Sequence, residues 1–191
     1  MTIKQLRSIY QLKVSLEGSK PPIWRRLLVK SDIKLDVLHL ALQISMGWTN
    51  SHLHQYISRD RKFYGIKDDD FEMDGFEMHD ETTVRLSNIL KDEKDSLIYE
   101  YDFGDSWTHK IIIEKILPFD TTKKLPYCVT GKRACPPENC GGIWGYSDLL
   151  KALEDPKHEE HDEMLDWLDG EFDPAYLNRR EINQLLLEYC R

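Results

Sequence analysis

The feature that most constrains the fold is a pair of alternating segments on either side of the string GDS, residues 104–106. In both segments every second residue is apolar or aromatic, a period of two that is typical of strands with one buried face. The alternating residues are Leu97, Tyr99, Tyr101 and Phe103 in the first segment and Trp107, His109, Ile111 and Ile113 in the second. Two such segments joined by a short polar string predict an antiparallel hairpin.

The register of this hairpin follows from matching the two apolar faces. A two-residue turn would pair Asp102 with Trp107 and set the aromatic residues of one strand against polar residues of the other. A three-residue loop at 104–106 pairs Phe103 with Trp107 instead, so that apolar residues face each other along the whole hairpin. We therefore expect the three-residue loop.

Candidate catalytic residues lie on this hairpin and in one later loop. The expected register places His109 on the buried face and Asp102 on the opposite face, so no pair between these two is expected. Asp105 lies at the tip, where we expect it to accept hydrogen bonds from its own loop, as in Asx turns. Together with Glu138, these residues are the candidates for acid–base chemistry.

The remaining patterns predict the fold class. Segments 10–16 and 23–29 alternate and predict a second antiparallel pair, and residues 35–46 carry an apolar stripe at helical spacing. Arg25 and Arg26 point to opposite faces of their strand, so one of them is expected to be buried beside an acidic partner. Further helical stripes fill the last third of the chain. We expect an α+β fold, an antiparallel or mixed sheet of hairpins packed against several helices, with a helical C-terminal third.

Size and charge bound the function. A chain of 191 residues with 40% apolar residues fits a single domain, 1–191. Residues 1–67 hold 12 Lys and Arg against 4 Asp and Glu, whereas residues 68–191 hold 14 against 30. We expect the two parts to neutralise each other, and a basic patch for nucleic acid is the alternative. The chain has no long apolar run and no signal-peptide pattern, so we expect a cytoplasmic protein without a membrane partner.

Two groups of residues have the chemistry of a divalent metal site. On a strand, His52 and His54 would share one face. Cys135 and Cys140 lie in a Pro- and Gly-rich stretch, 126–145, which is expected to be a structured loop without regular elements. The cysteine spacing does not match a zinc ribbon or finger, and the alternative is hydrogen-bonded histidines and buried thiols.

Aromatic residues in the loops are candidates for partner binding. They are Trp48, Trp107, Trp144 and Tyr146. Exposed aromatic side chains are good anchors for a protein partner or another ligand because they bury a large area at low entropic cost.

Several strings occur in an order that resembles the plasmid pRiA4b ORF-3-like family. They are PPIWRRLLV, GW followed by HLHQY, YDFGDSWTH, CPPENCGG followed by GY, and FDPAYLN, and they span the chain from about residue 10 to residue 186. The resemblance implies a compact α+β domain. It also implies an association with plasmids and mobile elements, where some members carry the label TnpR-like, a resolvase passenger. It implies no established biochemical activity.

Three functions remain open on this basis. The first is a binding or regulatory module linked to plasmid or mobile-element biology. The second is a metal-dependent enzyme that uses the histidines, acids and cysteines named above. The third is nucleic-acid binding through the basic first third of the chain. We rank them in this order, and the sequence does not decide whether the protein is an enzyme.

Overall fold

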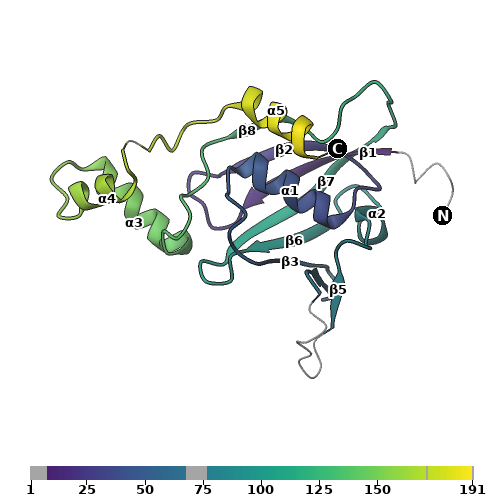
Figure 1. The fold of residues 1–191 in the computed structure, drawn as a ribbon, viewed down its shortest axis with the longest axis horizontal. Coiled ribbons are helices and arrows are strands. Elements are labelled where there is room, and N and C mark those ends of the chain that lie inside the picture. The colour runs from purple at the N-terminus through teal and green to yellow at the C-terminus, as the bar shows by residue number, and fades with distance from the viewer. Residues whose placement is uncertain (1–7, 68–76, 171, 191) are drawn as a thin grey trace.

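The computed structural model describes residues 8–67, 77–170 and 172–190, and within them one mixed sheet of eight strands carries the fold (Figure 1). The strand order is β5–β4–β3–β6–β7–β1–β2–β8, and every neighbouring pair is antiparallel except β4 and β5. The strands are β1 (Ser8–Leu16), β2 (Trp24–Lys30), β3 (His54–Ile57), β4 (Phe63–Gly65), β5 (Met78–Asp80), β6 (Ser96–Tyr101), β7 (Trp107–Pro118) and β8 (Tyr127–Lys132).

Five helices accompany the sheet in the described part of the chain. They are α1 (Leu35–Met46), α2 (Leu86–Ile89), α3 (Gly142–Glu154), α4 (His161–Trp167) and α5 (Arg179–Tyr189). α5 packs against α1 and β8, whereas α3 and α4 pack on each other and extend away from the sheet at one end of the molecule (Figure 1). The α+β class and the helical C-terminal third that the sequence predicts are confirmed.

The central hairpin forms as expected, but the register predicted from the sequence was wrong by two residues. Tyr101, not Phe103, lies opposite Trp107, and Tyr99 lies opposite His109. A shift of two keeps each residue on its face, so the two aromatic and aliphatic ladders still point to the same side. Phe103 leaves the strand and is half exposed, and the connection is the five-residue loop 102–106.

One face of the sheet carries the core beneath α1. Along β1 every second residue from Tyr10 to Leu16 is buried, as the alternation predicts. Tyr56 of β3 donates a hydrogen bond from its hydroxyl to the carbonyl oxygen of Leu35 at 2.9 Å, which ties the start of α1 to the sheet. α1 ends where Gly47 adopts a left-handed conformation, with φ of 96°.

Contrary to expectation, the buried arginine of β2 has no acidic partner among the residues that the structure describes. Arg25 donates to the carbonyl oxygens of Ser45, Trp24 and Lys132 at 2.6, 3.0 and 3.0 Å. Its neighbour Arg26 forms the ion pair, a forked contact with Glu114 of β7. Three backbone carbonyl oxygens give the planar guanidinium as many hydrogen bonds as a carboxylate would. The arginine is therefore stable in its buried position.

The stretch 126–145 is more regular than its Pro and Gly content predicts. β8 occupies its first part, pairing with β2 from Trp24 to Leu28, and α3 begins at Gly142. None of the helices in the described residues is long and apolar enough to cross a membrane.

Trp107 and Trp144 give a matched test of where the core lies. Trp107 is 1% exposed and Trp144 is 81% exposed. Trp107→Ala should lower the free energy of unfolding by about 3–5 kcal/mol because it leaves a large cavity, whereas Trp144→Ala should change it by less than about 0.5 kcal/mol. Urea unfolding followed by circular dichroism measures both, and similar losses for the two variants would contradict this core.

Candidate functional site

Three segments that are distant in sequence meet at the loop of the central hairpin. The backbone N–H of Asp102 donates to the carbonyl oxygen of Leu53 at 2.9 Å, which brings in the segment between α1 and β3. The backbone N–H of Gly141 donates to Oδ2 of Asp105 at 3.2 Å, which brings in the segment before α3. We call the polar side chains at this meeting point the tip cluster, which consists of Thr49, Ser51, His52, Tyr101, Asp102 and Glu138.

Asp102 organises the hairpin loop. Its φ is 58°, a left-handed conformation that Asp tolerates better than most residues. Oδ1 accepts hydrogen bonds from the backbone N–H groups of Gly104 and Asp105 at 2.9 and 3.3 Å. The Asx-type role expected for Asp105 is therefore played by Asp102, which leaves the carboxylate of Asp105 to reach Gly141.

Glu138 is held by a set of donors from both other segments. Oε1 accepts from the backbone N–H and the hydroxyl of Thr49, and Oε2 accepts from the hydroxyl of Ser51 at 2.7 Å. The hydroxyl of Tyr101 lies 3.1 and 3.2 Å from the two carboxylate oxygens. Burial pushes the pKa of Glu138 upward, but these hydrogen bonds outweigh burial and hold it below its ordinary value. Glu138 is therefore a carboxylate at neutral pH.

His52 lies between two carboxylates. Its Nε2 atom is 3.4 Å from Oε2 of Glu138 and 3.5 Å from Oδ2 of Asp102. The imidazole is 29% exposed, whereas the two carboxylates are 14% and 10% exposed. The tip cluster thus presents one partly exposed imidazole, whose Nε2 atom is itself buried against two recessed acids. Such an arrangement suits recognition of a hydrogen-bond donor or a cation.

A close backbone contact fixes the hairpin loop against the start of α3. Gly142 has φ of 67°, and a Cβ atom at this position would lie 2.6 Å from the carbonyl oxygen of Asp105. Only a residue without a side chain permits both the conformation and the approach. Packing on the hairpin loop therefore explains why the string CGG, residues 140–142, ends in a glycine.

His54 does not join His52, contrary to the expectation that the two share a strand face. β3 begins only at His54, whose Nε2 atom lies 2.7 Å from Oε2 of the buried Glu81. Its ring stacks on that of His39 with centroids 3.5 Å apart. His39 in turn contacts Tyr99 and Asn50 through its two ring nitrogens, at 2.9 and 2.7 Å. These residues form a second polar cluster inside the core.

The other candidate metal and catalytic residues are dispersed. His109 is fully buried, and its Nδ1 atom lies 2.9 Å from the carbonyl oxygen of Trp107. Burial raises the pKa of the Cys140 thiol to about 12 and that of Cys135 also well above its ordinary value. Across residues 8–67, 77–170 and 172–190, no group of three or more His, Cys, Asp and Glu side chains is placed to hold a metal ion.

The candidate aromatic anchors divide by burial. Trp48, Trp107 and Tyr146 are all less than 10% exposed, so in this fold they pack beneath the surface. Trp48 contacts Tyr101 and Trp107, with ring centroids 5.1 and 5.2 Å apart. Only Trp144 of the four is open to a partner.

Several residues of the site were not among the sequence candidates. Thr49 and Ser51 stand one position away from Trp48 and His52, and the run of small polar residues between α1 and β3 was the available signal. Tyr101 was assigned only to the buried ladder, although the buried hydroxyl of a tyrosine needs a partner. Leu53 and Phe103 were not candidates for binding either, because the sequence alone does not distinguish an exposed apolar side chain from a core residue.

Comparison with known proteins gives a consistent result. The model of a family described as plasmid pRiA4b ORF-3-like protein matches residues 8–181. A curated relative from Sinorhizobium fredii, the uncharacterized protein y4hQ, is 40% identical over 179 residues, which are 93% of this chain and 90% of the relative. The crystal structure of MM3350, a protein of unknown function from Methanosarcina mazei Go1, superposes with a TM-score of 0.82 at 36% identity. The superposition covers 93% of this chain and 98% of MM3350.

The two buried histidines predict how stability depends on pH. Burial lowers the pKa of His39 and of His109 from 6.5 to about 4. Between pH 6.5 and 4 the unfolded chain binds more protons than the folded chain, so the free energy of unfolding should fall as the pH is lowered through this range. Each pKa unit of difference is worth about 1.4 kcal/mol, so the total loss should reach several kcal/mol.

Two measurements check this pH dependence. Urea unfolding at pH 7 and pH 4.5 gives the change in stability, and proton NMR of the imidazole C–H groups shows which rings titrate in the folded state. Two rings that stay neutral down to about pH 4 would agree with the burial of His39 and His109. A stability that is flat from pH 7 to pH 4.5 would contradict it.

The contact at Gly142 predicts a second effect on stability. Gly142→Ala should destabilise the fold by about 1–3 kcal/mol, because the new methyl group meets the carbonyl oxygen of Asp105 in a conformation that alanine disfavours. Gly104→Ala is the matched control, since its Cβ would meet only a side-chain oxygen, at 3.2 Å. Thermal unfolding distinguishes them, and equal melting temperatures would show that the loop and α3 do not touch as described.

Proposed function

This chain belongs to the plasmid pRiA4b ORF-3-like family, and on that premise we propose that it is a protein-binding module whose docking surface surrounds the tip cluster. Its partner presents a basic side chain flanked by apolar side chains, and the association of the family with plasmids makes a regulatory protein of a mobile element the expected source. The observation that carries this proposal is the combination of recessed carboxylates and exposed apolar side chains around one loop.

The apolar part of the surface comes from all three converging segments. Leu53 is 60% exposed, Phe103 is 47% exposed and Trp144 is 81% exposed. Each stands within three residues of a backbone contact that joins its segment to the hairpin loop, so the three lie at the same end of the molecule. Large apolar side chains exposed together around a polar centre are typical of interaction sites.

The charge of the site supports a basic occupant. Asp102 and Glu138 lie side by side with His52, and Asp105 adds a third carboxylate in the same loop. The whole chain carries a net charge of -8. A Lys or Arg side chain of a partner would gain a charge-assisted hydrogen bond from the recessed acids and a favourable contact with the exposed ring of Trp144.

The layer beneath the surface supports binding by a rigid site. Trp48 packs edge-on against Tyr101, and the hydroxyl of Tyr101 reaches Glu138. The carboxylates are therefore positioned before any partner arrives. A preorganised site loses little side-chain entropy on binding, which favours affinity.

The two alternatives have less support in the described residues. The metal-dependent enzyme needs ligands that converge, and His54, Cys135 and Cys140 do not share a site with His52. Nucleic-acid binding needs free cations in the first third of the chain, and two of the arginines there, Arg25 and Arg26, are engaged in internal contacts. We therefore keep both as alternatives without a further observation in their favour.

A peptide array tests the proposed chemistry directly. The array carries peptides that pair an Arg or Lys with apolar neighbours, and matched peptides in which the basic residue is Gln. We expect the wild-type chain to prefer the basic peptides, and Trp144→Ala combined with Phe103→Ala to weaken binding of the best peptide by at least about tenfold, as for removal of interface anchors. Fluorescence polarisation with the labelled peptide measures the affinities.

Trp167→Ala is the matched control for this experiment. Trp167 is a half-exposed tryptophan at the end of α4, away from the hairpin loop. This variant should bind like the wild type. Equal binding of basic and Gln peptides, or equal losses in the Trp167→Ala control and the double variant, would refute the proposed surface.

A further inference from the structure

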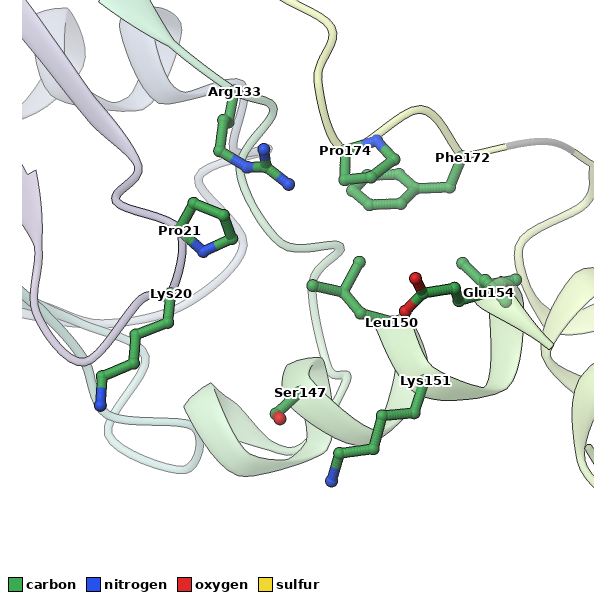
Figure 2. A pocket seen from close by; sticks show the side chains of 10 residues that line it. Lys20, Pro21, Arg133, Ser147, Leu150, Lys151, Glu154, Phe172 and Pro174 are labelled. Carbon is green, nitrogen blue, oxygen red and sulfur yellow. The ribbon is translucent and has the colours of Figure 1, made fainter.

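A separate pocket lies beside α3, lined by residues that are not part of the tip cluster. Its volume is about 620 Å³, within the range of sites for small organic ligands. The β1–β2 connection, the chain after β8, α3 and the segment before α5 each contribute to its walls (Figure 2). The lining residues are Lys20, Pro21, Arg133, Ser147, Leu150, Lys151, Leu153, Glu154, Phe172 and Pro174.

The polar lining of this pocket is mainly cationic. Lys20, Arg133 and Lys151 carry three positive charges against the single carboxylate of Glu154. This excess is notable in a chain whose net charge is -8. Lys151 shares its charge with the exposed Asp148 at 2.6 Å, and the side chain of Lys20 points away from Arg133 in Figure 2, so Arg133 is the main candidate to hold an anion.

Arg133 is placed to face into the pocket. It follows directly after β8, and its backbone φ is 71°, a left-handed conformation. Figure 2 shows its guanidinium pointing into the space between Pro21, Pro174 and Leu150. An arginine fork in this position can contact two oxygens of one phosphate.

The opposite part of the lining is apolar and flat. The ring of Phe172 lies next to Pro174 and above Leu150 in Figure 2. Phe172 packs edge-on against Tyr146 of α3, with ring centroids 6.3 Å apart and planes at 86°. An aromatic ring supported in this way can stack on a flat ligand group.

From this arrangement we propose that the pocket binds an organic phosphate with a flat apolar body, the chemistry of a nucleoside monophosphate. The phosphate lies against the guanidinium of Arg133, and the flat group lies on the neighbouring Phe172 and Pro174, whereas the ammonium group of Lys20 and the hydroxyl of Ser147 lie toward the other end of the pocket. The pocket and the docking surface share α3, but this proposal rests on its own residues and does not depend on the proposed function.

Isothermal titration calorimetry with three probes tests the ligand class. The probes are adenosine 5′-monophosphate, adenosine and inorganic phosphate. The monophosphate should bind with saturation, and adenosine and inorganic phosphate, which each keep half of the contacts, should bind at least about tenfold more weakly. No saturable binding of the monophosphate at millimolar concentration would overturn the proposal. So would equal affinity for inorganic phosphate, which would reveal simple charge attraction.

Two variants with opposite expected effects on affinity test whether the ligand binds in this pocket. Arg133→Gln should weaken binding of the monophosphate by about tenfold or more, since it removes the bidentate partner of the phosphate. Glu154→Gln should strengthen binding by about two- to threefold, since it removes a nearby negative charge that is largely solvated. Arg61→Gln is the matched control, because Arg61 is an exposed arginine with φ of 59° far from the pocket lining.

The variants must keep the fold for this comparison, which circular dichroism and thermal unfolding establish. Arg133→Gln with unchanged affinity and an intact fold would overturn the proposed pocket. Weaker binding in Glu154→Gln, or a loss in Arg61→Gln as large as that in Arg133→Gln, would overturn it as well.

Discussion

The interaction on which the site depends is the hydrogen bonding of the Asp102 carboxylate to the backbone of its own loop. By accepting from Gly104 and Asp105, Oδ1 closes a five-residue connection between β6 and β7. Oδ2 is then left to face His52, and Asp105 is left to reach Gly141. One side chain therefore shapes the loop, lines the tip cluster and allows the third segment to dock. A tighter turn would offer none of these contacts.

The buried aromatic layer explains how Glu138 remains charged at the edge of an apolar core. Burial alone would favour the neutral form of Glu138, but donors from Thr49, Ser51 and Tyr101 outweigh that cost. Tyr101 is itself wedged against Trp48, so the donor set is part of the packing and does not depend on solvent. The second cluster applies the same rule inside the core, where His39, His54 and Tyr99 each have a hydrogen-bond partner.

Much of the fold could be predicted from alternation, and little of the site could. Faces were assigned correctly along β6 and β7, because a register error of two residues leaves every side chain on its side. The loop length was wrong because apolar matching treated Phe103 as a core residue, and no local pattern reveals that Asp102 caps the turn. His52, Asp102 and Glu138 were each candidates, but their combination depends on contacts between segments 36 to 86 positions apart, which spacing in one sequence does not encode. Arg25 illustrates the same limit, since backbone carbonyls are invisible in the residue pattern.

The contact of α3 with the hairpin loop limits which changes in loop length such chains can tolerate. A Cβ atom at Gly145 would lie 1.9 Å from the carbonyl oxygen of Cys140, and one at Gly142 would lie 2.6 Å from that of Asp105. The first of these contacts lies within the turn at the start of α3, and the second joins this turn closely to the hairpin loop. An insertion in either loop would separate the two loops. Homologous chains are therefore expected to have insertions in both loops or in neither.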